Sequence, residues 1–481
     1  MNRGAVLAVA VLVVVAVSAF ALLGSSPGNV STSSSRSTST TSSGTSTTRT
    51  STTASSTSRS GCPQTSFPFV DWTTYHGNNS RAGSTAGSVA CAKADWTSQK
   101  LDGAAYAEPL VYSGLVFVAT ENDSVYALNE TSGAVLWRTH IAAPVDGGSL
   151  PCGNISPSGI TGTPVIDPGT KTIYVVAYEA PATLHYLVAI SITDGRIVFS
   201  QPADPPGATV KVQQERGALS LGNGMVYIPY GGLDGDCGQY HGWVVGIKAD
   251  GSGAMFSYQV PTGREGGIWA TSGGAIDSTG DLFVATGNGA SSSIFDYGNA
   301  VVKLSPSLQQ LDYFAPSNWL QLNNGDTDLG SVGPTLLGNN EIFQIGKEGV
   351  GYLLNTTKLG GIGGQVYSGD VCSSVYGGTA ATWAYVFVPC SNGLVALSYS
   401  PNSFQVLWRS PSFPSGPPIV TGNVVWAIDT SSGTLHGYDA KTGTSLFSFS
   451  TGQVTRFTTP ATGDGRVFVA AGSKILAFQI S

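Results

Sequence analysis

The sequence contains 481 residues, of which 41% are hydrophobic and 11% charged, and its formal net charge is −7 at pH 7. The apolar content is sufficient for a large core, whereas the few charges leave solvation mostly to hydroxyl groups and to a backbone with 63 glycines. A net negative charge without any long Lys/Arg run argues against a nucleic-acid partner.

An uncharged apolar segment opens the sequence. Residues 5–23 read AVLAVAVLVVVAVSAFALL and are long enough to span a hydrocarbon core. Arg3 precedes them and favours a cytoplasmic N-terminus. We therefore expect residues 1–24 to be a single transmembrane helix that anchors an extracellular protein to the membrane. A signal peptide cleaved after residues 17–19 is the alternative, and it would release a secreted protein.

A low-complexity segment follows. Between residues 31 and 60, 25 of 30 positions are Ser or Thr, and none is aromatic. Such a composition cannot bury enough apolar surface to offset the entropy of ordering. We expect residues 25–61 to be a disordered stalk that carries O-linked glycans. Six Asn-X-Ser/Thr motifs are also compatible with an exported glycoprotein.

The sequence contains six cysteines, an even number that predicts disulfides in an exported protein. The pairs that we favour are Cys62–Cys91, Cys152–Cys237 and Cys372–Cys390, although the sequence alone leaves the connectivity open. There is no CxxC or CxxCH motif, so neither a zinc ribbon nor an attached c-type haem is indicated.

From about Cys62 onward the sequence repeats. The clearest unit, GLVFVATENDSVYALNETSGAVLWRTH at residues 114–140, predicts strands at 115–119, 124–128 and 134–139. A second copy, NVVWAIDTSSGTLHGYDAKTGTSLFSFS, occupies residues 423–450. No segment after the anchor has a sustained apolar period of 3.6 residues, so the sequence predicts an all-β fold with almost no helix.

The spacing of the repeats predicts an eight-bladed β-propeller at residues 62–481. Eight aromatic residues mark the last strand of each unit, at spacings of 39 to 62 residues: Trp96, Trp137, Phe199, Phe256, Tyr313, Tyr367, Trp408 and Phe447. One four-stranded blade needs about forty residues. The C-terminal unit KILAFQIS lacks an outer strand, whereas the segment that begins at Ala94 resembles an outer strand without a blade before it. Pairing these two segments would close the ring.

Several motifs resemble the quinoprotein, or pyrroloquinoline quinone (PQQ)-like, β-propeller family. They are WTTYHGNNSR at residues 72–81, the repeated LNxTSGxxLW pattern, and the TGN at residues 286–288. Longer segments such as QQERGALSLGNGMVYIPYGG and GKEGVGYLL resemble a secreted branch of the same superfamily. The resemblance spans residues 71–481. The short blade motif is shared with noncatalytic propellers, including outer-membrane assembly factors, so it specifies the fold more than the chemistry.

The resemblance implies a cofactor site. Quinoprotein dehydrogenases place PQQ on a tryptophan beside a calcium ion, with an aspartate as base and a cation beside the quinone. Trp269, in the segment GGIW, matches the stacking tryptophan. Asn288 matches the amide ligand of Ca²⁺, and Asp236, in GGLDGDCGQYHG, lies where the family has its carboxylate ligand. A planar cofactor needs an aromatic face and Ca²⁺ needs oxygen ligands, which these residues offer.

The remaining candidates are a base and further cofactor contacts. Asp326 or Asp328, in NGDTDLG, falls near the catalytic aspartate of the family, and Lys347 matches its cation. Arg216 and His241 are titratable residues in apolar surroundings, and we add them as candidate cofactor contacts. The sequence also departs from the family: it has no adjacent Cys-Cys pair, no haem domain, fewer loops than the full alcohol dehydrogenases and a rearranged aspartate motif.

Each candidate also has a purely structural interpretation. Trp269 could pack between blades, Asn288 could adopt a left-handed turn, and the two aspartates could cap turns. Arg216 could pair with Glu215 or with a loop aspartate, and His241 could be a hydrogen-bonded interior imidazole. The clustering of the candidates in one place would favour a ligand site over these interpretations.

The leading hypothesis is an exported, monomeric PQQ-dependent oxidoreductase, with PQQ and Ca²⁺ as cofactors, that acts on alcohols or sugars. The alternative is a noncatalytic surface scaffold that binds a protein or a glycan. No HExxH, P-loop or EF-hand motif occurs in the sequence, and its GxSxG match, GSSPG at residues 24–28, lies at the start of the expected stalk and not between a strand and a helix. Other enzyme classes therefore lack support.

Overall fold

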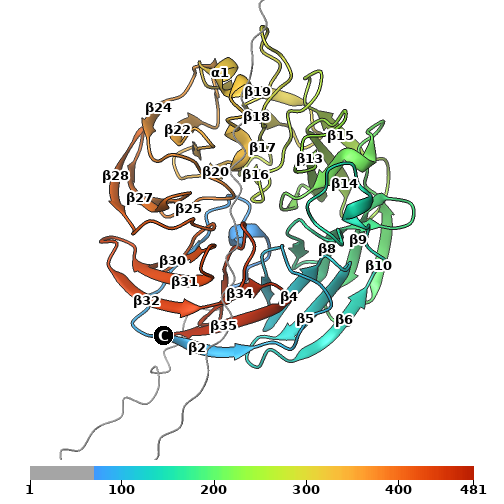
Figure 1. Ribbon diagram of the computed structural model, residues 1–481, viewed down its shortest axis with the longest axis vertical. Coiled ribbons are helices and arrows are strands. Elements are labelled where there is room, and N and C mark those ends of the chain that lie inside the picture. Colours follow the sequence, from blue (N-terminus) through green and yellow to red (C-terminus); the bar gives the residue numbers. More distant parts are fainter. Residues whose placement is uncertain (1–69) are drawn as a thin grey trace, which may run out of the picture. The chain divides into compact units, whose positions relative to one another are not determined.

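In the computed structural model, which describes residues 70–481, eight β-sheets follow one another around a ring (Figure 1). This arrangement confirms the predicted eight-bladed propeller. The predicted anchor and stalk, and the cysteine at position 62, lie outside the described residues. Within residues 70–481, no helix has the length and the apolar character needed to cross a membrane.

The first four blades contain these strands. Blade 1 has β3 (Leu110–Tyr112), β4 (Leu115–Thr120), β5 (Ser124–Asn129) and β6 (Val135–His140). Blade 2 has β7 (Val165–Asp167), β8 (Thr172–Glu179), β9 (Leu184–Ser191) and β10 (Ile197–Pro202). Blade 3 has β11 (Gln213–Glu215), β12 (Ser220–Gly222), β13 (Met225–Gly232), β14 (Trp243–Lys248) and β15 (Phe256–Gln259). Blade 4 has β16 (Ala275–Ile276), β17 (Leu282–Ala285), β18 (Val301–Leu304), β19 (Gln310–Ala315) and, parallel to β19, β23 (Gly361–Ile362).

The other four blades complete the ring. Blade 5 has β20 (Thr335–Leu336), β21 (Glu341–Gln344), β22 (Val350–Asn355) and β24 (Tyr367–Asp370). Blade 6 has β25 (Ala380–Ala381), β26 (Tyr385–Cys390), β27 (Gly393–Ser400) and β28 (Ser403–Arg409). Blade 7 has β29 (Ile419–Thr421), β30 (Val424–Asp429), β31 (Thr434–Asp439), β32 (Ser445–Ser450) and, parallel to β29, β1 (Ser84–Thr85). Blade 8 has β33 (Ala461–Gly463), β34 (Arg466–Ala471), β35 (Lys474–Ile480) and β2 (Ala92–Thr97).

Helix is confined to short segments between strands. The described residues contain one α-helix, α1 (Trp319–Asn324), and the 3₁₀ turns η1 (Tyr75–Gly77), η2 (Gly147–Ser149), η3 (Val210–Val212) and η4 (Leu329–Ser331). Both predicted disulfides among the described cysteines are present, Cys152–Cys237 and Cys372–Cys390.

The burial of each strand follows its place in the blade. Central strands such as β4 (LVFVAT) are buried along almost their whole length because neighbouring blades cover both faces, whereas outer strands such as β6 (VLWRTH) alternate between partly buried and exposed. The predicted ring closure is confirmed: β2 pairs antiparallel with β35, and Figure 1 shows the two strands side by side.

Aromatic side chains on outer strands connect adjacent blades. The Trp137 indole of blade 1 donates to the Ile192 carbonyl of blade 2 at 3.1 Å and covers Gly195, where a Cβ atom would lie 2.7 Å from the ring. The Trp408 indole of blade 6 makes the same contact with Gly443 of blade 7. Both glycines have positive φ, so the turn and the ring each require glycine there.

A segment before β2 closes one end of the central channel. We call residues 72–85 the N-terminal plug. The segment reaches the middle of the ring (Figure 1), and its backbone carbonyls accept hydrogen bonds from the inner strands of six blades. The donors are the backbone N–H groups of Val111, Ile166, Ile276, Leu336, Ala381 and Val420. The WTTYHGNNSR motif is therefore explained by its contacts with the ring.

Arg81 fixes the plug from within. Its side chain is fully buried, and it donates to the Gly274 carbonyl at 2.9 Å, to the Leu219 carbonyl at 3.1 Å and to the Ser220 hydroxyl at 2.7 Å. It also binds the plug itself through the Thr74 hydroxyl at 2.6 Å. One guanidinium thus joins the plug to blades 3 and 4.

We expect Arg81→Met to lower the free energy of unfolding by at least about 3 kcal/mol, because buried carbonyls would lose their donors. Arg409→Met on the exposed part of β28 is the matched control and should change stability by no more than about 0.5 kcal/mol. Denaturant unfolding of the two variants measures the difference. Equal stabilities would show that the plug does not depend on Arg81.

Candidate functional site

The other end of the channel opens into a cavity of about 790 Å³. In an antiparallel blade, the start of the innermost strand and the end of the next strand lie at the same edge of the sheet. The cavity is lined by residues from these two positions on several blades. They include Tyr106, Thr161, Arg216, Asp236, Trp269, Asn288, Asp326, Asp328, Lys347, Tyr376 and Arg456. Seven of the eight residues predicted from the sequence are in this set.

Trp269 is only partly buried, and its indole lines the cavity. Lys347 Nζ lies 5.8 Å and the Arg216 guanidinium carbon 6.0 Å from the centre of the ring. Two glycines pack closely against Trp269. A Cβ atom at Gly231 would lie 2.8 Å from the Trp269 Cβ, and a Cβ atom at Gly287 would lie 3.1 Å from the Trp269 Nε1 atom. The glycine before Asn288 is thus needed for packing against the tryptophan.

Four predicted residues form one hydrogen-bonded group beside the indole. Lys347 Nζ lies 2.6 Å from Asp328 Oδ2 and 3.1 Å from Asp326 Oδ1. Asp328 Oδ1 accepts the backbone N–H of Asn288 at 2.7 Å, and Asp326 Oδ1 accepts from the Asn288 side-chain amide at 2.8 Å. The partners belong to blades 4 and 5. Because they are far apart in the sequence, their contacts could not be predicted from it.

The two partners of the Lys347–Asp328 ion pair differ in burial. Burial raises the pKa of Asp328 above its ordinary value, although the Lys347 charge and the Asn288 N–H oppose this rise. Burial opposes the charged form of Lys347, but the Asp328 and Asp326 carboxylates together outweigh it and raise the pKa of Lys347. The side chain of Asp328 is 9% exposed and that of Lys347 18%, so desolvation prevails only at the aspartate. The lysine stays charged, and the aspartate is a stronger base than an exposed one.

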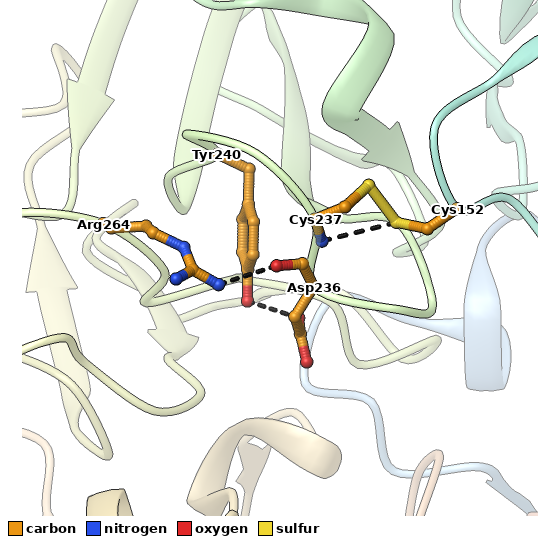
Figure 2. Close-up of a disulfide and its surroundings, with 5 residues drawn as sticks. All are labelled: Cys152, Asp236, Cys237, Tyr240 and Arg264. Atoms are coloured by element: carbon orange, nitrogen blue, oxygen red, sulfur yellow. Dashed lines mark hydrogen bonds between the residues drawn. A yellow bond between two sulfur atoms is a disulfide. The ribbon is translucent and has the colours of Figure 1, made fainter.

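Asp236 is held at the edge of the cavity by its neighbours (Figure 2). Its Oδ1 atom accepts the Tyr240 hydroxyl at 2.6 Å, and its backbone carbonyl accepts from Arg264 at 2.7 Å. The Cys152–Cys237 disulfide fixes the next residue and joins this loop to the segment before β7. The predicted carboxylate is therefore tied down on both sides.

The structural interpretations of these residues are partly excluded. Asn288 does not have a positive φ, whereas Asp326 does, at +49°. Asp328 precedes η4 but forms no side-chain cap there, because its carboxylate faces Asn288 and Lys347. Arg216 pairs with neither Glu215 nor a loop aspartate within residues 70–481, and it donates instead to Gln214 Oε1 at 2.7 Å.

His241 is the predicted residue that does not line the cavity. Its backbone N–H donates to Gln213 Oε1 at 3.0 Å, while its buried Nδ1 atom has no partner. Burial lowers the pKa of His241. Its neighbour Tyr240 does line the cavity. Adjacent residues of an extended backbone point to opposite sides, which accounts for the difference.

Other site residues were not predicted from the sequence. Asn299 has a positive φ and links the Asn288 amide at 3.0 Å to the Asn323 amide at 2.8 Å. Arg456 and Tyr376, which precede the innermost strands of blades 8 and 6, also line the cavity. Asn299 could have been recognised in the sequence because it follows Tyr-Gly, a position where asparagine tolerates a left-handed backbone. No local sequence pattern distinguishes Arg456 or Tyr376 as site residues.

The donors on one side of the cavity are of the type that Ca²⁺ prefers. Asp236, Glu265 and Asp328 all raise the pKa of Tyr240 beyond the effect of burial, so they surround one region, and Asn288 adds an amide. Within residues 70–481, no three His, Cys, Asp or Glu side chains lie close enough together to hold a metal ion. The donor chemistry thus fits calcium, and the side chains must close around the ion to bind it.

A sequence family described as outer membrane protein assembly factor BamB matches residues 77–309 and 391–480, more than half of the chain. The chain belongs to this family. Such BamB-type repeats agree with the PQQ-like resemblance found in the sequence. No curated protein matches the chain significantly.

Solved structures share the fold of this BamB-family chain. Quinohemoprotein alcohol dehydrogenase ADHIIG from Pseudomonas putida HK5 has a TM-score of 0.68 at 13% identity, over 85% of this chain and 80% of that chain. A europium-containing methanol dehydrogenase has a TM-score of 0.67 at 12% identity, over 85% and 98%. BamB from Moraxella catarrhalis has a TM-score of 0.58 at 12% identity, over 81% and 100%. These likenesses establish the propeller fold alone.

The cavity also borders a buried acid of the channel. Glu108 accepts the Trp72 indole N–H at 2.8 Å and the His76 backbone N–H at 2.9 Å, and burial raises its pKa to about 8. The unfolded chain ionises near the ordinary value of 4.5, whereas the folded protein retains the proton up to about pH 8. The contribution of Glu108 to stability is therefore full at low pH and is lost as the pH rises through this window.

We expect Glu108→Gln to reduce the fall in unfolding free energy between pH 5 and pH 8, by up to about 1.4 kcal/mol per pH unit. Glutamine resembles the protonated acid but cannot ionise. Chemical denaturation at several pH values measures the slope for each protein. A slope identical to that of the wild type would contradict the assigned pKa.

Proposed function

We propose that the cavity binds a PQQ-type quinone on the Trp269 indole and that the protein is an exported oxidoreductase acting on an alcohol or a sugar. The observation that carries this proposal is a partly exposed indole with two cations beside its ring, inside one cavity. A flat ligand that bears carbonyl oxygens suits such a site, because it offers a π-face to the indole and an acceptor to the Lys347 ammonium.

When bound, the quinone would supply the acceptor for a hydride from the alcohol carbon. Asp328 is then the better of the two candidate bases. Its carboxylate lines the cavity, burial increases its proton affinity, and Lys347 keeps a positive charge 2.6 Å from Oδ2. Asp326 is 73% exposed and contacts Lys347 from the solvent side. Asp326 would therefore orient the lysine.

Calcium would be held by Asp236 and Asn288 on the acidic side of the cavity, as the resemblance implies. Tyr240 and Arg264 position Asp236, and Asn299 orients the Asn288 amide. A divalent ion there would offset the repulsion among Asp236, Glu265 and Asp328. It would also add positive charge near a carboxylated cofactor.

A second candidate function has support from the family. BamB is described as an outer membrane protein assembly factor, and BamB of Moraxella catarrhalis has the same fold. A noncatalytic scaffold of this kind would bind a protein or a glycan on the surface of the ring. The polar cavity would then have no small-molecule ligand.

Calorimetric titration with PQQ, with and without Ca²⁺, separates the two functions. We expect PQQ binding that Ca²⁺ strengthens, and an affinity at least ten-fold lower in Trp269→Ala, a loss of about 1.4 kcal/mol. Trp383→Ala removes an indole that is 91% exposed and lies outside the cavity, so this control should bind like the wild type. Asp236→Asn and Asn288→Ala should abolish the calcium effect.

Two results would go against the cofactor assignment. One is undetectable heat of binding at high PQQ concentration, which would favour the scaffold. The other is an equal loss of affinity in the Trp269 and Trp383 variants, which would indicate nonspecific stacking.

A further inference from the structure

Two arginines line the cavity, Arg216 and Arg456. Neither Arg216 nor Arg456 forms an ion pair within residues 70–481. Arg216 gives one hydrogen bond, to the neutral amide of Gln214. Carboxylates compensate Lys347 in the same cavity, so the two guanidinium groups are the cations with free donors.

The two arginines act on each other although they come from different blades. Arg216 lies between β11 and β12 of blade 3, and Arg456 precedes β33 of blade 8. Burial lowers the pKa of Arg216, and the charge of Arg456 lowers it further. The carboxylates of Asp234, Glu121 and Asp236 act in the opposite direction. Two cations that repel each other across a cavity define a place where an anion is stabilised.

Aromatic rings hold Arg456 in place. Its guanidinium carbon lies 4.0 Å from the centre of the Tyr376 ring and 5.4 Å from that of Phe457. The Tyr376 contact holds the guanidinium over the ring, and Arg456 forms no ion pair among the described residues that would occupy its N–H groups. A guanidinium held in this way favours the planar, two-oxygen geometry of a carboxylate.

The position of Arg456 places this anion beyond the cofactor. Arg216 and Lys347 lie over the Trp269 ring, whereas Arg456 stacks on Tyr376, whose ring centre is 6.5 Å from that of Trp269. Arg456 is thus one aromatic ring further from the indole on which the quinone would rest.

We propose that Arg216 and Arg456 form a carboxylate subsite, and that the small molecule which enters the cavity is an acidic sugar or hydroxy acid. The identification of this ligand as a substrate rests on the proposed oxidoreductase function. The subsite itself does not, because both arginines line the cavity of the protein without quinone or calcium.

The test compares two probes, D-glucuronate and its uncharged isostere D-glucuronamide, by calorimetric titration of the purified full-length protein. We expect glucuronate to bind at least ten-fold more tightly than the amide. Arg456→Ala should remove this preference, and Arg456→Lys should restore part of it, because the charge returns without the two-pronged geometry. Arg409→Ala, an exposed arginine on the outer strand of blade 6, should behave like the wild type. Thermal unfolding of each variant verifies that it folds.

Repeating the titrations with saturating PQQ distinguishes the substrate from the cofactor as the source of the carboxylate. The proposal requires that glucuronate still binds and that Arg456→Ala leaves PQQ affinity unchanged. It is overturned if glucuronate and glucuronamide bind equally, or if PQQ competes with glucuronate and loses affinity in Arg456→Ala. Glucuronate binding without any PQQ binding would refute the proposed oxidoreductase and leave the carboxylate subsite standing.

Discussion

The packing of an aromatic ring on a glycine turn of the next blade is the contact on which the architecture depends. Trp137 covers Gly195 and Trp408 covers Gly443, and each indole also donates to a carbonyl of the covered blade. A side chain on the glycine would collide with the ring, and the turn needs a positive φ. The contact therefore fixes the distance and tilt between neighbouring sheets. Where it is repeated, successive sheets are arranged in a ring.

Ring formation leaves a central channel, and the N-terminal plug decides which end can bind a ligand. The plug satisfies inner-strand N–H groups of six blades, and Arg81 ties it to blades 3 and 4. The cavity at the other end is lined by the segments that precede the innermost strands of all blades except blade 7. Residues far apart in the sequence, such as Arg216 and Arg456, meet there because every blade presents the same edge.

The sequence was sufficient to predict the blades, their number and the closing strand, because an aromatic residue recurs on the outer strand of each unit. Trp269, Asn288 and Lys347 were found through short motifs shared with a known family, and the structure places them together. Arg456 and Tyr376 could not be predicted from the sequence, because only the closure of the ring brings blades 6 and 8 to the same cavity as Trp269. The Cys152–Cys237 pairing was predicted, but its role beside Asp236 needed the three-dimensional structure.

The central claim is that Trp269 is the floor of a cofactor site. A crystal structure of the protein grown with PQQ and Ca²⁺ tests it most directly. We expect density for a planar ligand parallel to the Trp269 indole and for an ion near Asp236 and Asn288. A cavity without ligand density at saturating PQQ, or a ligand seated away from the indole, would contradict it.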